Sequence, residues 1–113
     1  MKSKILALSK NEEFKNLIKQ KKITNKYATI FFGKLANKSK NKLNISFVAK
    51  RKIGNAVKRN KIKRRLRNIM NDAVENITLK FDYSYLVIAK PTMLNKEYTI
   101  IKETLFRDLE RIY

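Results

Sequence analysis

The sequence predicts an α/β protein, a small two-layer sandwich whose elements follow the order α-β-β-α-β-α along the chain. Three observations predict this class. Apolar side chains alternate or cluster over three short segments, as in strands, and recur every three or four positions over three longer ones, as in helices. The 113 residues include only two glycines and one proline, so little interrupts regular structure. No long polar linker divides residues 1–113, which are expected to form one domain.

A first helix is expected over residues 10–21. Phe14, Leu17 and Ile18 fall there at helical spacing. The apolar stripe that they form is narrow, so this helix is expected to bury only a small face.

Two strands are expected next. Residues 27–34 (YATIFFGK) are rich in aromatic and β-branched side chains, and residues 43–49 (LNISFVA) alternate apolar with polar ones. Residues 36–42 (ANKSKNK) between them are polar and rich in lysine. They are expected to form a hairpin connection whose charges discourage pairing with a further strand.

A long helix is expected after the turn that Gly54 and Asn55 mark. Apolar residues from Ile62 to Ile77 recur at intervals of three and four. A helix of about twenty residues is about 30 Å long. Most of its circumference outside the apolar stripe is basic or amide.

The last two elements are a strand and a helix. Residues 83–90 (YSYLVIAK) are apolar on both faces in their second half, which predicts a strand in the interior of the sheet, and Pro91 ends it. From Asn95 onward the apolar residues return to helical spacing. This terminal amphipathic helix carries most of the acids of its region.

The whole chain has a net charge of +19, and the positive charge is concentrated in one part of it. Residues 14–71 contain nineteen of the twenty-eight basic residues and no acid, whereas residues 72–113 contain six bases and seven acids. Residues 50–67 (KRKIGNAVKRNKIKRRLR) alone contain ten bases. Charge runs are usually solvated faces, but ten like charges so close together repel one another. This clustering favours a binding face for a polyanion.

Composition excludes several kinds of chemistry. The chain has no cysteine and no histidine, which removes disulfides, thiol chemistry, zinc-finger ligation and the usual general base. It also lacks a glycine-rich phosphate loop, so we expect no catalysis by its own side chains and assign no catalytic residue and no metal ligand. No signal peptide or membrane span is recognisable, which predicts a cytoplasmic protein.

Several aromatic side chains have two open interpretations. Each is first a candidate for the hydrophobic core, but a ring on an exposed sheet face beside basic residues can instead stack on an unpaired base. Sequence alternation does not decide which sheet face is exposed. The residues concerned are Phe14, Phe31, Phe32, Phe47, Tyr83 and Tyr85.

The basic segment carries a resemblance to a known family. Residues 53–67 (IGNAVKRNKIKRRLR) resemble the signature of the bacterial ribonuclease P protein subunit: a Gly-Asn-Ala-Val turn, then Arg-Asn-Arg and a basic helix. Residues 46–52 (SFVAKRK) resemble the strand and basic pair before that turn, and residues 82–91 (DYSYLVIAKP) resemble the family's later strand. Lys61 replaces the second arginine of Arg-Asn-Arg, which keeps the positive charge but loses the forked hydrogen-bond donor of arginine.

The resemblance implies a function. Members of this family bind the catalytic RNA of ribonuclease P and the 5′ leader of precursor tRNA, and form the non-catalytic subunit of an endoribonuclease that makes mature tRNA 5′ ends. The RNA performs the chemistry with Mg²⁺ ions that are bound mainly by the RNA subunit and the substrate. No membrane and no obligate protein partner are expected. The resemblance also implies a left-handed crossover from the second strand through the basic helix to the third, against the general right-handed rule.

The resemblance implies two groups of site residues in this RNA-binding domain. Basic and amide side chains of the long helix and its preceding loop face the RNA, and aromatic side chains in a cleft beside the first helix hold the leader. The RNA-binding group is Lys50, Arg51, Lys52, Asn55, Arg59, Asn60, Lys61, Lys63, Arg64 and Arg67, and the leader-binding pair is Phe14 and Phe32.

Three other classes of protein remain as alternatives. Composition alone favours a small basic ribosomal protein or another structural RNA-binding protein, which has no reason to reproduce the Arg59-Asn60 pair after Gly54-Asn55. A DNA-binding protein that reads sequence needs a dimer seam, of which the sequence shows no sign. A membrane-surface helix is disfavoured because the chain has no tryptophan and a folded body explains the apolar stripe.

Overall fold

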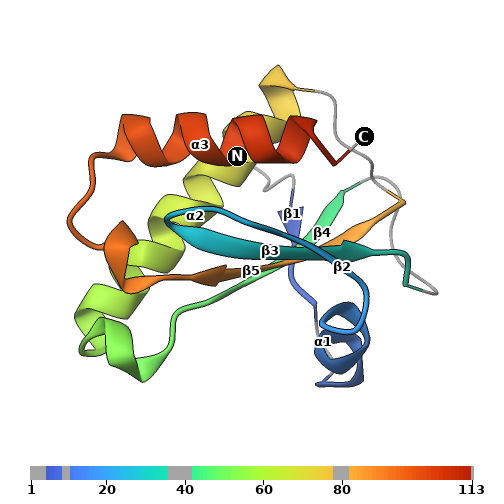
Figure 1. Cartoon of the computed structure of the whole chain (residues 1–113), viewed down its shortest axis with the longest axis horizontal. Helices are drawn as coiled ribbons and strands as arrows, with labels where there is room; N and C mark the ends of the chain where they lie inside the picture. Colours follow the sequence, from blue (N-terminus) through green and yellow to red (C-terminus); the bar gives the residue numbers. More distant parts are fainter. Residues whose placement is uncertain (1–4, 9–10, 36–41, 78–81, 113) are drawn as a thin grey trace.

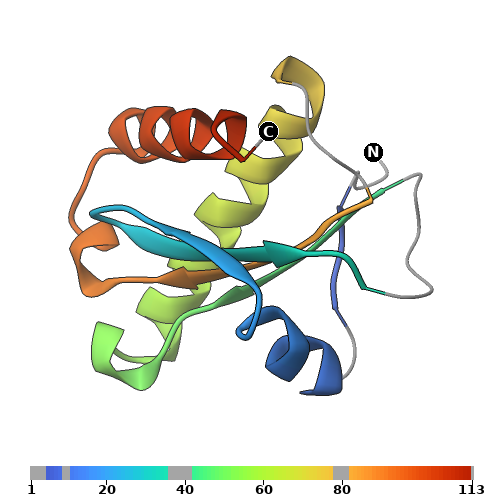
Figure 2. The same cartoon turned by 45° about the vertical axis from the view of Figure 1, so that its right-hand side comes forward.

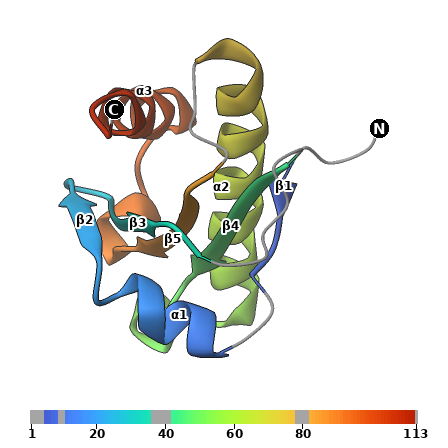
Figure 3. The same cartoon turned by 90° about the vertical axis from the view of Figure 1, so that its right-hand side faces the viewer.

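A five-stranded mixed sheet runs through the middle of the protein, with one helix on one face and two on the other (Figures 1 and 3). The computed structural model describes residues 5–8, 11–35, 42–77 and 82–112. The strands are β1 Ile5–Leu6, β2 Lys21–Thr24, β3 Ala28–Gly33, β4 Leu43–Val48 and β5 Ser84–Ala89. The helices are α1 Asn11–Leu17, α2 Ala56–Asn76 and α3 Tyr98–Glu110, with 3-10 turns η1 Arg51–Ile53 and η2 Pro91–Met93.

The predicted α/β class and the order of the six predicted elements are confirmed. The first helix is shorter than predicted, because the chain turns after Leu17 and Lys21 already begins β2. The amide of Gln20 donates to the carbonyl of Leu17 within that turn. Residue 10, where the helix was expected to begin, lies outside the described residues. The two short strands β1 and β2 were not predicted.

The strand order is β1-β4-β5-β3-β2, so the predicted hairpin between β3 and β4 is wrong. β5 lies between them, antiparallel to β3 and parallel to β4. The physical reason is the composition of β5: a strand that is apolar on both faces is stable at the centre of a sheet, where neighbours cover both its edges. Its predicted interior position is confirmed, and residues 36–41 of the connection lie outside the described residues.

Two hydrophobic clusters cover the two sheet faces. The larger one lies between the sheet and the helices α2 and α3, and includes Ile45, Tyr85, Leu66 and Leu105, all fully buried. The smaller one lies under α1, where Leu8 and Leu17 pack against Leu86 of β5. Figure 2 shows α1 and α3 on opposite sides of the sheet. The two faces are therefore covered unequally, and the α1 face has less protein over it.

The helix α2 connects the parallel neighbours β4 and β5. Asn55 caps its first turn, because its side-chain oxygen accepts a hydrogen bond of 3.0 Å from the amide of Lys58. Gly54 before it adopts φ 153°, which residues with a side chain rarely adopt. The left hand of this crossover, which the resemblance implies, stays a prediction. None of the helices in the described ranges is long and apolar enough to cross a membrane.

Candidate nucleic-acid interface

The helix α2 presents a basic surface to solvent. Its buried side is apolar, with Ile62, Leu66 and Ile69 in the larger core, so the helix directs its charged side chains outward. Most of the predicted RNA-binding residues lie on α2 or just before it, and most of their side chains are exposed. We call basic surface the exposed residues Arg51, Lys52, Asn55, Asn60, Lys61, Arg64 and Arg67 together with the half-buried Arg59 and Lys63.

Arg59 differs from its neighbours on the basic surface. Its side chain is half-buried, and its Nε atom is buried with no hydrogen-bond partner in the part of the chain that the structure describes. A buried donor without a partner is unfavourable by about 1–3 kcal/mol. Because this Nε atom is buried, an external phosphate would have to be met by the terminal nitrogens of the guanidinium.

A second basic site lies on the α1 side of the sheet. We call it the sheet groove, a hollow of about 250 Å³ lined by Lys22, Thr29, Phe31, Lys50, Lys52, Ile88, Ala89 and Lys90. Four lysines from three separate segments meet there, and no carboxylate is among the lining residues. The Nζ atom of Lys90 donates a hydrogen bond of 2.7 Å to the backbone carbonyl of Asn25, which holds this ammonium in place.

Phe31 is the aromatic residue of the sheet groove. It is half-buried and packs with Leu86 and Ile88 in the smaller cluster, because alternate residues of β3 and β5 share one sheet face. A ring at the floor of a cationic groove is the arrangement that single-stranded nucleic acids need: bases stack on the ring while phosphates meet the charges.

The prediction that Phe14 and Phe32 lie together in one cleft is wrong. Phe32 lies on the opposite sheet face, in the larger core, with 7% of its surface exposed. It stacks there on Tyr83, with ring centroids 6.1 Å apart and planes at 23°. The period of two along β3 decides the difference, since Phe31 points to one face and Phe32 to the other.

Phe14 lies instead on α1, where it packs against the smaller cluster. It lines a hollow of about 450 Å³, the edge pocket, formed by Ile5, Ala7, Phe14, Ile45, Ser46, Phe47, Lys63 and Arg67. The Ser46 hydroxyl accepts a hydrogen bond of 2.8 Å from the amide of Leu8, which fixes the chain after β1 against β4. The structure therefore brings Phe14 together with two predicted RNA-binding residues of α2.

Sequence reasoning missed several residues of the sheet groove. Lys22 belongs to the unpredicted strand β2, and Lys90 was assigned only to the end of β5. Phe31 had been left open between core and binding. Once β2 is known to pair with β3, the register gives the signal, because Lys22 stands opposite Phe31 and so shares its face.

Several acids lie on α3 and at the end of α2. Lys102 pairs with Asp72 at 3.1 Å and lies 5.5 Å from the ring centre of Phe106. Burial raises the pKa of the Tyr98 hydroxyl above its usual value of 10.0, and Asp72 raises it further. No group of three potential metal ligands occurs within the described ranges.

The fold and these surfaces define a small basic α/β protein that offers a cationic helix and a lysine-lined aromatic groove to a polyanion. By its sequence the chain belongs to the ribonuclease P protein family: the Ribonuclease P family model matches residues 3–113. The match supports the interpretation made from the basic segment. It gives no support to the ribosomal-protein alternative.

Individual relatives agree with this assignment. The chain is 32% identical over 102 residues to the ribonuclease P protein component of Carboxydothermus hydrogenoformans, covering 87% of this chain and 83% of that protein. It is 32% identical over 106 residues to that of Mycoplasma mycoides, covering 93% and 94%. The solved RNase P protein from Thermotoga maritima superposes with a TM-score of 0.80 at 26% identity, covering 96% and 98%.

Proposed function

We propose that this chain is the protein component of ribonuclease P, which binds the RNA subunit and the 5′ leader of precursor tRNA. It assists the Mg²⁺-dependent endonucleolytic removal of that leader, which makes the mature tRNA 5′ end. Family membership supports the role in tRNA processing. The observation that carries the leader assignment is the sheet groove, where four lysines surround the half-buried ring of Phe31.

The basic surface is the part that binds the RNA subunit in this proposal. Structured RNA presents closely spaced phosphates, and the side chains of η1 and of residues 58–67 of α2 carry positive charge along about three turns of helix. Lysine and arginine neutralise phosphates, while Asn55 and Asn60 can donate to phosphate or sugar oxygens. Arg59 is half-buried among these residues and adds its positive charge to the surface.

The sheet groove is the part that takes the leader. A single-stranded leader has exposed bases, so one base can stack on Phe31 while Lys22 and Lys90 meet the flanking phosphates. Lys50 and Lys52 line the groove and also begin the basic segment, so the leader would run directly beside the RNA subunit.

The division of labour follows from the donors available. Phosphate oxygens are ligands that Mg²⁺ prefers, so the metal ions would be held mainly by the RNA subunit and the substrate. The protein's own contribution is to bind the leader, orient it and reduce repulsion between the two RNAs, with a net charge of +19. We place this activity in the cytoplasm.

The experiment combines the purified chain with the ribonuclease P RNA from the same genome and a precursor tRNA with a long leader. The chain alone is expected to leave the substrate intact. The RNA alone is expected to cleave slowly and only at high Mg²⁺, and the mixture efficiently at low Mg²⁺. Cleavage is followed on a denaturing gel, with the 5′ end of the product sequenced.

Two outcomes contradict the proposal. Robust cleavage by the chain without RNA assigns the chemistry to the protein. Equal cleavage by the RNA with and without the chain, at every Mg²⁺ concentration, removes the protein from the reaction. A variant with Phe31→Leu and Lys22→Gln tests the groove, because it should reduce the preference for long over one-nucleotide leaders while still assembling with the RNA.

A further inference from the structure

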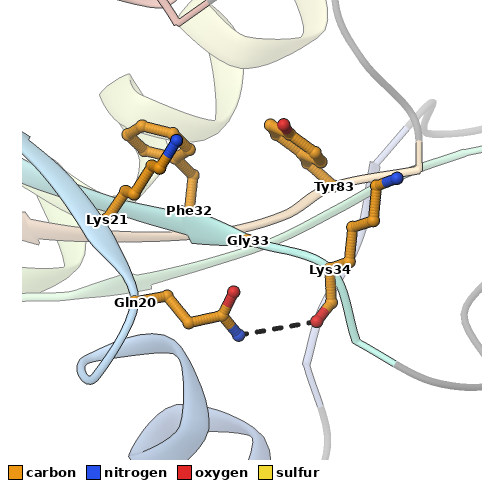
Figure 4. A pocket seen from close by; sticks show the side chains of 6 residues that line it. All are labelled: Gln20, Lys21, Phe32, Gly33, Lys34 and Tyr83. Carbon is orange, nitrogen blue, oxygen red and sulfur yellow. Dashed lines mark hydrogen bonds between the residues drawn. The ribbon is translucent and has the colours of Figure 1, made fainter.

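A third hollow, of about 230 Å³, lies where β2 begins and β3 ends, and we call it the aromatic pocket. It is lined by Gln20, Lys21, Phe32, Gly33, Lys34 and Tyr83 (Figure 4). We propose that this pocket holds one unpaired nucleotide of an RNA strand, with the base against Tyr83 and the phosphate near Lys21 and Lys34. The proposal rests on the proposed function for RNA as the ligand, and adds a second contact at a separate place on the sheet.

The rings of Phe32 and Tyr83 support each other by stacking. Phe32 and Tyr83 stack at 6.1 Å with planes at 23°, and their side chains stand on the same side of β3 in Figure 4. Phe32 is buried, whereas Tyr83 is half-buried and offers the accessible ring. A ring that is already packed against another loses little freedom when a base stacks on it, so the platform is preorganised for a flat ligand.

The charges near the platform suit a phosphate. Lys21 and Lys34 are both exposed, and no carboxylate is among the lining residues. The Nζ atom of Lys34 lies 3.5 Å from the carboxylate of Asp82, with side-chain exposures of 70% and 48%. Exposed ion pairs of this kind stabilise a protein little and are screened by salt. An incoming phosphate can therefore replace the aspartate as the partner of Lys34.

The size of the pocket restricts the ligand. Pockets for drug-sized molecules are roughly 300–1,000 Å³, and this one is smaller, which fits a single base. A Cβ at Gly33 would come within 1.9 Å of the Gln20 side-chain oxygen. The Gln20 carboxamide therefore lies against the strand, with its nitrogen 3.5 Å from the carbonyl oxygen of Lys34.

The aromatic pocket and the sheet groove share no lining residue. Lys21 and Lys22 are adjacent in β2 but stand opposite Phe32 and Phe31 respectively, and so belong to different faces. The two sites can therefore be altered separately.

The test uses the full chain and a single-stranded RNA octamer that carries one 4-thiouridine. After irradiation, tandem mass spectrometry locates each cross-link to a residue. We expect one cross-link at Tyr83 and another at Phe31. Tyr83→Leu should weaken binding at this site by about fivefold to a hundredfold, as expected for one lost stacking contact, and circular dichroism checks that the variant folds.

A charge reversal gives a second variant that does not depend on the core. Lys34→Glu should reduce the cross-link at Tyr83 and leave the one at Phe31 unchanged. Lys96→Glu is the matched control, an exposed lysine that lines none of the three hollows, and it should leave both cross-links unchanged.

The outcomes separate this inference from the proposed function. A cross-link at Phe31 without one at Tyr83 overturns the inference and leaves the leader assignment standing. No cross-link to any peptide at low salt overturns both. A competition experiment adds uridine monophosphate. If uridine monophosphate removes the Tyr83 cross-link and an excess of octamer does not displace the uridine monophosphate, the occupant is a free nucleotide and the RNA assignment is overturned.

Discussion

Phe31 and Phe32 are adjacent in β3, yet they have different surroundings and different consequences for function. Phe31 lies half-buried among lysines in the sheet groove, and Phe32 is buried in the larger core against Tyr83. The sequence supplies both rings but not the face of each, because alternation fixes only that they differ. Knowledge of which helices cover which face is needed to decide.

We expect the two alanine variants to separate stability from binding. Phe32→Ala should lower the free energy of unfolding by about 3–5 kcal/mol, because it leaves a cavity in the core. Phe31→Ala should lower it less and should weaken binding of a precursor tRNA with a long leader by about 1–3 kcal/mol through lost stacking. Urea unfolding and holoenzyme affinity for long and one-nucleotide leaders measure the two effects.

The comparison between leaders is the control for that prediction. If Phe31→Ala reduces affinity equally for both leaders, the ring stabilises the protein and does not contact the leader. If Phe32→Ala leaves the unfolding midpoint unchanged, its placement in the core is wrong.

At the scale of elements, one residue at the start of α2, Asn55, affects both the stability of the helix and the binding of RNA. Asn55 caps the helix through the amide of Lys58 and also belongs to the basic surface. Asn55→Asp keeps an oxygen for the cap and suits the positive end of the helix, so stability should hold, but the added negative charge should weaken RNA binding. Asn55→Ala should instead lower the free energy of unfolding by about 0.5–2 kcal/mol.

Thermal unfolding measures the stability of the two variants, and RNA titration measures their affinity for RNA. The prediction fails if Asn55→Asp binds RNA as well as the unaltered chain. Asn55→Ser, which retains the cap without charge, is the matched control and should resemble the unaltered chain in stability.

The turn between β2 and β3 is tied to α3 through Asn25. Its side-chain oxygen accepts from the amides of Tyr27 at 2.7 Å and Ala28 at 2.9 Å, and its nitrogen donates to the Asp108 carboxylate at 2.8 Å. Asp108 is buried, with 6% of its surface exposed. These bonds hold the edge of the sheet against the last helix.

Asn25→Ala should therefore lower the free energy of unfolding by about 1–3 kcal/mol, because it leaves buried polar groups without this partner. Glu103→Ala on the exposed side of α3 is the control and should change it by less than about 0.5 kcal/mol. Urea unfolding at neutral pH measures both. Equal effects of the two substitutions contradict the assigned role of Asn25.

The elements differ in how far the sequence could predict them. Periodicity predicted α2, α3 and β5, because each buries a broad apolar surface. It could not predict β2, whose four residues KKIT offer only Ile23 to the core. Nor could it predict the strand order, because the position of β5 between β3 and β4 depends on contacts far apart in the sequence. The basic surface was predicted from its residues, whereas the sheet groove required β2.

At the scale of the whole molecule, charge divides the protein into two parts. The basic surface and the sheet groove carry the excess of positive charge, while α3 and the end of α2 contain both acids and bases. RNA binding should therefore weaken steeply with salt, with a slope of log K against log salt of about −0.7 per phosphate contact for single strands. Lys63→Gln with Arg64→Gln should flatten this slope, and Lys96→Gln with Lys102→Gln should not.

The measurement is RNA affinity over a series of salt concentrations. An affinity that does not change with salt contradicts the phosphate account. Equal flattening by both double variants shows that net charge acts at a distance and that the basic surface makes no local contacts.

The central position of β5 has a consequence for the synthesis of the protein. The ribosome makes β3, β4 and α2 before it makes β5, which pairs with both strands. Until residues 84–89 leave the ribosome, the inner edges of β3 and β4 have no partner, and α2 has only part of a sheet to pack on. Open strand edges favour wrong pairings, and pairings between distant residues form slowly. The nascent chain therefore carries its basic helix on an incomplete sheet, and acquires its RNA-binding shape only after β5 has been made.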